Sequence, residues 1–319
     1  MNQIPDKRGT EATISAVGGR SPSFPSSANL DDLAEIMVKH WEHAISAVLP
    51  DKPDLIVLPE MCDRYEQTPP EILPRLRPRV SAGMTQMLSK TAREHGCYIA
   101  YATTATDENG LWRNAVVMLD RSGRTLASYY KNFLVSTEIE RGLTPGATPC
   151  LAECDFGRVG FVVCFDLNFT ELLEAYRQLK PDLIVFPSHY HGGVMQPYWA
   201  YQTRAHFLGC MGMAGIPSEV YSPVGQLLAS STNYFSHVTA KVNLNCAVVH
   251  LDFHWEKLRA LKIRHGRDVL ISDPGQLGAV LVTCQNPALS ITRLIQEFEI
   301  ETLDSYLDRS RALNQTARI

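Results

Sequence analysis

The sequence predicts a layered α+β protein in which helices cover the faces of β-sheets. Short apolar runs suited to strands alternate with longer helical patterns from about residue 12 to residue 252. Some neighbouring runs are joined by a turn of hairpin length, as in NAVVMLD, RSGR and TLASYYK. The predicted sheet is therefore mixed rather than purely parallel. With 319 residues, 45% of them hydrophobic and 20% charged, the chain can bury a sizeable core.

The predicted strands are apolar runs bounded by turn-forming residues. In chain order they are 12–19, 54–60, 97–104, 114–120, 125–131, 159–164, 182–188, 209–215, 226–232 and 246–252. Helices are predicted between them wherever apolar residues recur at helical spacing. These are 33–48, 81–95, 170–179, 196–207 and 255–264.

The first predicted helix illustrates the criteria. Leu33, Met37 and Trp41 recur at helical spacing. Asn29 is a suitable N-cap, and the acidic pair that follows it suits the positive end of the helix dipole. We therefore expect an amphipathic helix that begins just after Asn29.

The chain shows no linker, repeat or low-complexity tract in its middle. We expect one catalytic domain over residues 1–285, with its first dozen residues flexible. Two further helical pieces, ITRLIQEF and ETLDSYLDRSRAL, follow Pro287. Residues 286–319 are therefore expected to form an extension that packs on the domain or on a neighbouring subunit.

Charge and hydropathy argue against several classes of protein. A formal net charge of −4 leaves no basic surplus for binding nucleic acid or anionic membranes. The start of the chain lacks the pattern of a secretory signal, and no apolar run approaches the roughly 20 residues needed to span a bilayer. The eight cysteines are scattered, as is typical of reduced thiols. A cytoplasmic protein is expected.

Three predicted strands end in reactive side chains. LIVLP leads to Glu60, TLASYY to Lys131 and VGFVV to Cys164. Binding crevices form beyond the carboxyl ends of strands in open sheets, so these residues can converge although they are far apart in the sequence. Each alone has an ordinary structural explanation, and the coincidence of all three is more informative.

At these positions the sequence resembles the nitrilase, or carbon-nitrogen hydrolase, superfamily. LPE, YYKNFL and VGFVVCFDLNFTEL look like that family's glutamate, lysine and cysteine motifs, in family order. The resemblance extends from about residue 12 to residue 285. It implies a four-layer αββα sandwich, commonly assembled into homodimers or larger homo-oligomers.

The resemblance also implies roles for these residues. Cys164 would be the nucleophile, Glu60 the general base and acid, and Lys131 with the backbone N–H of Phe165 the stabiliser of an oxyanion. The expected reaction hydrolyses a small amide or N-carbamoyl compound through a cysteine thioester and releases ammonia. It needs no metal and no organic cofactor.

Other residues near the motifs receive supporting assignments. The resemblance implies a second glutamate after the lysine, for which Glu138 has the expected spacing and Glu140 is the alternative. His189 and Tyr190 follow a strand end and are expected to line the substrate pocket. Nitrile-cleaving members usually carry Trp–Glu after the cysteine, whereas this chain carries Phe165 and Asp166. The amidase and carbamoylase branches are therefore favoured.

Alternative interpretations remain open from the sequence. His189 or His191 could pair with the cysteine in a Cys–His hydrolase. A catalytically silent binding or assembly protein could retain the same fold. Three residues of HLDFH, namely His250, Asp252 and His254, lie on one face of a strand at a spacing that could suit a metal. Cys150 and Cys154 lack a second pair that would complete a zinc site.

Overall fold

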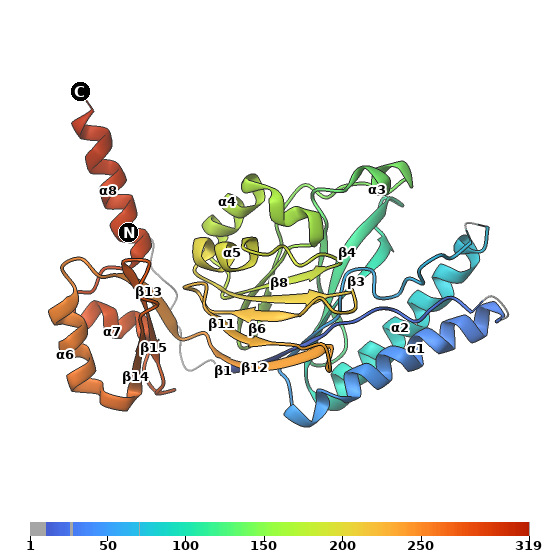
Figure 1. Cartoon of the computed structure of the whole chain (residues 1–319), viewed down its shortest axis with the longest axis horizontal. Helices are drawn as coiled ribbons and strands as arrows, with labels where there is room; N and C mark the ends of the chain where they lie inside the picture. The colour runs from blue at the N-terminus through green and yellow to red at the C-terminus, as the bar shows by residue number, and fades with distance from the viewer. Residues whose placement is uncertain (1–10, 26–27, 70, 319) are drawn as a thin grey trace.

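The computed structural model describes residues 11–25, 28–69 and 71–318. Most of the N-terminal stretch expected to be flexible lies outside these residues. Two six-stranded sheets form the centre of the molecule (Figure 1). The first has the order β12-β1-β2-β3-β4-β5, and the second has the order β11-β10-β9-β8-β7-β6.

Both sheets are mixed, as the sequence predicts. In the first sheet β2 pairs in parallel with β1 and β3, and the remaining pairs are antiparallel. Its strands are β1 (Glu11–Val17), β2 (Leu55–Val57), β3 (Tyr98–Thr106), β4 (Trp112–Leu119), β5 (Thr125–Tyr130) and β12 (His237–Asn243). The strands of the second sheet are β6 (Leu151–Cys154), β7 (Gly157–Phe161), β8 (Leu183–Ser188), β9 (His206–Met211), β10 (Glu219–Tyr221) and β11 (Leu227–Ser230).

Helices cover the outer face of each sheet. The first sheet packs against α1 (Leu30–Ser46) and α2 (Leu73–His95), and the second against α4 (Thr170–Leu179) and α5 (Met195–Thr203). A third apolar cluster fills the space between the two sheets. The three apolar cores lie between successive layers of a four-layer αββα sandwich, which confirms the predicted fold class.

Local sequence explains how α1 forms and what it holds. The Asn29 side chain accepts hydrogen bonds from the backbone N–H groups of Asp31 and Asp32, which caps the helix as predicted. On its buried face, Trp41 donates from Nε1 to the carbonyl oxygen of Cys62 over 2.6 Å. Because Cys62 follows Glu60 closely in the chain, α1 also fixes the loop that carries this glutamate.

The helix α2 begins earlier than the sequence predicts. It starts at Leu73, whereas the sequence predicts a start at residue 81. The prediction starts later because Pro74 and Pro78 interrupt the helical pattern of the sequence. Pro74 lies in the first turn, where its missing N–H has no partner to lose, whereas Pro78 lies inside the helix. The additional turns line a cavity described below.

A separate three-stranded sheet follows the sandwich. Its order is β13-β15-β14, with β13 (Cys246–His250), β14 (Val269–Ser272) and β15 (Ala279–Cys284). Together with α6 (Trp255–His265) and α7 (Ile291–Glu297) it encloses its own apolar core. The domain boundary expected at residue 285 remains a prediction, while the sheets themselves separate between Asn243 and Cys246.

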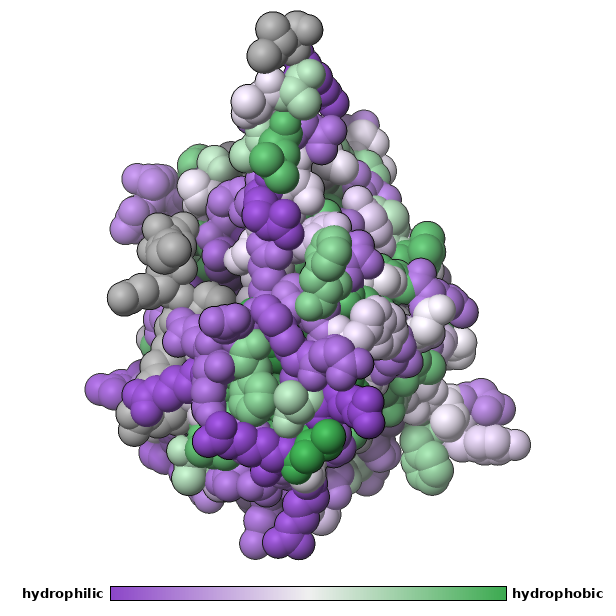
Figure 2. Space-filling model, turned by 90° about the vertical axis from the view of Figure 1, so that its left-hand side faces the viewer, coloured by the Kyte–Doolittle hydropathy of each residue, from purple (hydrophilic) through white to green (hydrophobic). Residues whose placement is uncertain are grey.

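The last helix, α8 (Leu303–Ala317), extends away from this small unit (Figure 1). Tyr306 stacks on His250 with ring centroids 3.8 Å apart, and Asp304 pairs with Arg204 of the sandwich at 3.1 Å. The two helices predicted after Pro287 are thus present. Figure 2 faces the small unit and shows its apolar residues as separate groups among polar ones. In the described part of the chain, no helix combines the length and the apolar character needed to cross a membrane.

Candidate active site

Glu60, Lys131 and Cys164 come from both sheets. Glu60 follows β2, and Lys131 follows β5 directly, with its N–H donating to the carbonyl oxygen of Asn114 over 2.8 Å. Cys164 lies just beyond β7 and opens a short 3-10 helix, η2 (Cys164–Asn168). The sequence therefore predicts correctly that each residue lies at a strand end.

The charged groups form one buried network. Lys131 Nζ lies 2.9 Å from Glu60 Oε1 and 2.9 Å from Glu138 Oε2. Asn114 Nδ2 donates to both carboxylates, over 2.9 Å to Glu60 and 2.7 Å to Glu138. Lys131 is only 2% exposed and Glu60 3%. An ammonium and an amide thus hold two carboxylates in a fixed arrangement away from water.

Glu138 is placed by a short helix, α3 (Ser136–Glu140). Its Oε2 also accepts from the backbone N–H of Val135 over 3.0 Å, so both carboxylate oxygens have donors. Glu140, the alternative from the sequence, is exposed. The structure therefore brings Glu138, and not Glu140, to Lys131.

Cys164 occupies a strained backbone conformation. Its φ is 48°, a left-handed value that is costly for residues other than glycine. This conformation turns the chain sharply from β7 into η2. The thiol is half-buried, and Glu60, Lys131 and Ser188 are the groups that act on its pKa.

Burial and charge set the protonation states of these groups. Burial, followed by the negative charge of Glu60, raises the pKa of the Cys164 thiol to about 12, although Lys131 acts in the other direction. Burial alone would also raise the pKa of Glu60, but the charges of Lys131 and His189 outweigh it and lower this pKa. For Lys131, burial opposes the charge of Glu60, and the charge prevails, so its pKa is raised. Thus a neutral thiol lies beside an ionised carboxylate and an ammonium.

Asp166 fastens the turn that carries Cys164 to the strand that carries Lys131. Its carboxylate accepts from the hydroxyl of Tyr129 over 2.7 Å and from the backbone N–H groups of Phe133 over 2.7 Å and Val163 over 3.0 Å. The carboxyl is fully buried, which raises its pKa to about 6 although all three hydrogen bonds lower it. Asp166 therefore acts on the geometry of the site without facing the reacting atoms.

The remaining predicted residues lie around this centre. His189 Nδ1 is 3.5 Å from Glu60 Oε2. Asn168 Nδ2 donates to the carbonyl oxygen of Phe165 over 3.0 Å and to the hydroxyl of Tyr190 over 3.1 Å. His189 and Tyr190 thus both lie close to the candidate catalytic residues, His189 by direct contact with Glu60 and Tyr190 through Asn168 in the turn that begins at Cys164.

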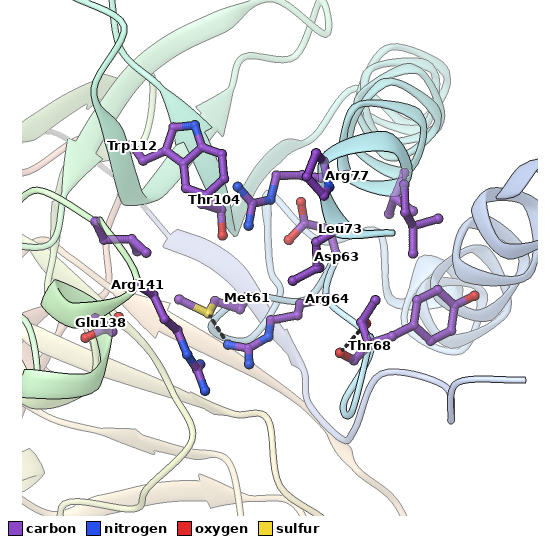
Figure 3. Close-up of a pocket in the computed structure, with 15 residues that line it drawn as sticks. Met61, Asp63, Arg64, Thr68, Leu73, Arg77, Thr104, Trp112, Glu138 and Arg141 are labelled. Carbon is purple, nitrogen blue, oxygen red and sulfur yellow. Dashed lines mark hydrogen bonds between the residues drawn. The ribbon is translucent and has the colours of Figure 1, made fainter. Parts of the chain in front are cut away.

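Two cavities border residues of this centre, and Figure 3 shows one of them. One of about 390 Å³ is lined by Glu138 and by residues of α2, and one of about 290 Å³ is lined by His189. Met61 and Arg64 border both. Volumes of this size suit a small organic molecule.

The histidines of the alternative interpretations contact other groups of the protein. His191 pairs with Glu219 at 2.9 Å, and His254 Nδ1 lies 2.9 Å from the carbonyl oxygen of His250. Across residues 11–25, 28–69 and 71–318, no group of three or more His, Cys, Asp or Glu side chains is arranged to hold a metal. Cys150 and Cys154 are free thiols.

Sequence reasoning missed Asn114 and Ser188. Asn114 begins an apolar run in β4, and a buried amide there is the one local signal that could have marked it. Ser188 is the last residue of β8, so it lies at a strand end, as Glu60 and Lys131 do. In both cases the partner lies on another element, so the contact is invisible from local sequence.

A family model for carbon-nitrogen hydrolases matches residues 22–228. The chain belongs to this family. The match covers more than half of the chain, and it includes the strands and turns that carry Glu60, Lys131 and Cys164.

Individual relatives in this family are distant. The omega-amidase NIT2 of Homo sapiens is 22% identical over 201 residues, which are 59% of this chain and 73% of the relative. The same enzyme of Pongo abelii is 23% identical over 220 residues, which are 65% of this chain and 79% of the relative. Carbon-nitrogen hydrolase family members with amidase activity are therefore among the similar proteins.

Solved structures agree in fold. A carbon-nitrogen hydrolase from Helicobacter pylori G27 matches with a TM-score of 0.62 at 15% identity, covering 74% of this chain and 90% of that one. An amidase from Nesterenkonia sp. matches with a TM-score of 0.57 at 18% identity, covering 75% and 93%. A variant of the amidase from Nesterenkonia sp. AN1 carries the acetamide moiety of fluoroacetamide covalently at its active-site cysteine.

Proposed function

We propose that the protein hydrolyses the C–N bond of a small amide or N-carbamoyl compound, with Cys164 as nucleophile, Glu60 as general base and acid, and Lys131 as oxyanion stabiliser. The observation that carries this proposal is the meeting of these three side chains. Glu60 Oε1 lies 2.9 Å from Lys131 Nζ, and both of these charged groups act on the pKa of the Cys164 thiol. Family membership supports amide hydrolysis in general.

The first half of the reaction forms a thioester. Because the thiol is neutral at rest, its proton passes to Glu60 as the sulfur attacks the carbonyl carbon. The C–S bond forms and the carbonyl oxygen becomes an oxyanion, which Lys131 and the backbone N–H of Phe165 stabilise. The C–N bond then breaks, and the nitrogen takes the proton from Glu60 and leaves as ammonia.

The second half releases the acid. Water gives a proton to Glu60 and attacks the thioester carbon, so that a C–O bond forms and the C–S bond breaks. The sulfur recovers the proton from Glu60. The sum is amide plus water giving carboxylic acid plus ammonia, and every proton is carried by the one carboxyl group.

Glu138 supports this cycle by holding Lys131. Its carboxylate lies 2.9 Å from Lys131 Nζ and is itself held by Asn114 and Val135. Two carboxylates beside one ammonium keep that ammonium charged and fixed in direction. Glu138 is thus proposed as a positioning residue, and His189 and Tyr190 as residues of the pocket wall.

The test is intact-mass analysis of protein quenched during turnover of a panel of small primary amides and N-carbamoyl compounds. We expect an acyl adduct on Cys164 and release of ammonia. Cys164→Ala should abolish both, while Glu60→Gln should abolish turnover. Binding without turnover across the panel would identify a silent binding protein instead. Adduct formation that survives Glu60→Gln but is lost in His189→Ala or His191→Ala would identify a Cys–His hydrolase.

A further inference from the structure

Three phenylalanines form a cluster of rings beside the candidate nucleophile. The ring of Phe133 stacks on the ring of Phe169, with centroids 3.7 Å apart and planes inclined by 4°. The ring of Phe165 meets Phe169 edge-on, with centroids 5.2 Å apart and planes inclined by 80°. All three residues are partly exposed, and we call them the aromatic stack.

The aromatic stack joins two segments that are distant in the sequence. Phe133 lies two residues after Lys131, in the loop that leads into α3. Phe165 is the second residue of η2, which begins at Cys164, and Phe169 follows the last residue of η2. Contact between the rings therefore connects the segment that carries the ammonium to the segment that carries the thiol.

Hydrogen bonds hold the backbone on both sides of the stack. The N–H of Phe133 donates to the carboxylate of Asp166 over 2.7 Å, and the N–H of Phe169 donates to the carbonyl oxygen of Asp166 over 3.1 Å. Asn168 Nδ2 donates to the carbonyl oxygen of Phe165 over 3.0 Å. The rings are thus attached to backbone that is itself fixed, so their contacts have a defined direction.

The N–H of Phe165 depends on the conformation of the residue before it. Cys164 has a φ of 48°, and a strained conformation of this kind persists only when its surroundings hold it. Rotation about the bond from the Cys164 Cα to its carbonyl carbon would turn the N–H of Phe165 without moving the sulfur. Because the ring and the N–H of Phe165 belong to one residue, holding the ring against Phe169 restricts the direction of the N–H.

The direction of this N–H matters for the proposed reaction. A donor stabilises an oxyanion only when it points to the place where the negative charge develops. Loss of one such donor typically lowers kcat by about a hundred- to a thousandfold, and a misplacement of about 1 Å can cost about a hundredfold. Partly exposed rings contribute less to stability than fully buried ones, so replacing them should disturb the site more than the fold.

We propose that the aromatic stack positions the oxyanion donor, in that Phe133 and Phe169 hold the ring of Phe165 and so keep its N–H directed at the carbonyl oxygen of the substrate. The inference rests on the proposed function, which assigns the nucleophile to Cys164 and the donor to Phe165. The three rings are positioning residues, because they act through the N–H and touch no reacting atom. They stabilise the tetrahedral intermediate and leave binding of the intact amide unchanged.

The first test uses an aldehyde, which forms an oxyanion at Cys164 without hydrolysis of any amide. The sulfur adds to the aldehyde carbon, so that a C–S bond forms, the thiol proton passes to Glu60 and the carbonyl oxygen becomes an oxyanion. Butanal that carries an isotope label at its carbonyl carbon makes this adduct visible by NMR. Titration then measures how strongly the protein stabilises the oxyanion.

Phe169→Leu and Phe133→Leu should each weaken the butanal adduct about tenfold or more, because leucine fills apolar volume but cannot stack. Phe169→Tyr keeps the ring and should stay within about threefold of the unchanged protein. If Phe169→Leu does not fold, Phe133→Leu tests the same contact from the other side. Leucine variants that bind butanal as tightly as the unchanged protein would overturn the inference.

A second reagent separates the oxyanion donor from the thiol. Methyl methanethiosulfonate transfers its methylthio group to a cysteine sulfur and releases methanesulfinic acid, so an S–S bond forms and no carbonyl oxygen becomes charged. The rate of this reaction at Cys164, followed by mass analysis of its peptide, should be equal in the leucine variants and the unchanged protein. A loss as large as the loss of butanal binding would mean that the stack acts on the sulfur, and the inference would be wrong.

Phe298→Leu is the matched control. Phe298 is also partly exposed and also contacts another ring, that of His265 with centroids 5.9 Å apart, but it packs on the core of the small unit. The same substitution there should change neither butanal binding nor the reaction with methyl methanethiosulfonate. A control variant that weakens butanal binding as much as Phe169→Leu would reject a specific role of the stack.

Turnover separates this inference from the proposed function. Phe133→Leu and Phe169→Leu should lower kcat for a small primary amide about ten- to a hundredfold and leave KM nearly unchanged. A change confined to KM would assign the rings to the pocket wall and overturn the inference. Full kcat in both variants would retain the amidase and reject the role of the stack. Butanal binding that depends on the stack, without hydrolysis of any amide, would retain the role of the stack and reject the amidase.

Discussion

The hydroxyl of Tyr129 donates a hydrogen bond of 2.7 Å to the buried carboxylate of Asp166. The tyrosine lies on the strand that leads to Lys131, and the aspartate lies in the turn that begins at Cys164. This bond therefore joins the two sheets at the point where the proposed ammonium and nucleophile meet.

Asp166→Asn should misplace the nucleophile. All three partners of this carboxylate are donors, so one of them would face the amide NH₂ of an asparagine. We expect kcat to fall at least about tenfold, and the free energy of unfolding to fall by about 1–3 kcal/mol, the cost of leaving a buried donor unpaired. Amide turnover and urea unfolding measure the two effects.

Tyr129→Phe serves as the matched comparison, since it removes one donor and leaves the carboxylate its two backbone donors. Its effect on kcat should be smaller than that of Asp166→Asn. If Asp166→Asn retained full kcat, the carboxylate would have no part in placing Cys164.

Glu138→Gln should reduce kcat by about ten- to a hundredfold, equivalent to about 1.5–3 kcal/mol. Either oxygen of Glu138 faces a donor, so the amide NH₂ of the variant must oppose Asn114 or Lys131. Lys131 would then lose its fixed direction toward the oxyanion. Steady-state kinetics on one primary amide measures the loss, and Glu140→Gln, at an exposed residue of the same helix, should leave kcat unchanged.

His189→Gln should move the acid limb of kcat/KM to higher pH. Burial raises the pKa of Glu60, and the charges of Lys131 and His189, together with hydrogen bonds, lower it. Removing the histidine charge lets this pKa rise, so the carboxylate becomes protonated, and ceases to act as a base, at a higher pH. A pH profile of kcat/KM measures the shift.

His191→Gln is the control for this profile, because His191 pairs with Glu219 rather than with Glu60. Its acid limb should coincide with that of the unchanged enzyme. An acid limb that stays in place in His189→Gln would show that the histidine charge does not reach Glu60.

Lys131→Met should lower the free energy of unfolding at pH 7 by about 3–5 kcal/mol, because it leaves the buried Glu60 and Glu138 without their cation. The loss should depend on pH. Glu60 has a lowered pKa in the folded protein, so its stabilising contribution is present above the unfolded value of 4.5 and is lost as pH falls through the folded value.

In the variant, burial without a cation raises the pKa of Glu60, so the folded state gains protons and stability as pH falls. The difference between the two proteins should therefore be larger at pH 7 than at pH 4. Urea unfolding at both values tests this. A difference that is equal at the two pH values would contradict the coupling between Lys131 and Glu60.

Local sequence patterns predict the parts of this molecule that depend on neighbours in the chain. Strand ends, the Asn29 cap and the reactive residues that follow β2 and β5 belong to this class. Sheet membership does not, because it is decided by pairing between distant segments. The strand around residue 246 is thus predicted correctly as a strand, while its place in a third sheet is not.

The same limit applies to the candidate site. The motifs predict that Glu60, Lys131 and Cys164 belong together, but Asn114 is recognisable only once β4 is placed beside both carboxylates. Residues that come together only when the chain folds leave no pattern in the local sequence.

The protonated state of the Cys164 sulfur bears on how the protein withstands oxidation. Because burial and the charge of Glu60 raise the pKa of this thiol to about 12, the sulfur stays protonated at pH 7. Peroxides and general alkylating agents attack the thiolate, so they should modify this cysteine slowly. Only a compound that seats an electrophilic carbon beside the sulfur while Glu60 removes the proton should react quickly, which spares the sulfur between encounters with substrate.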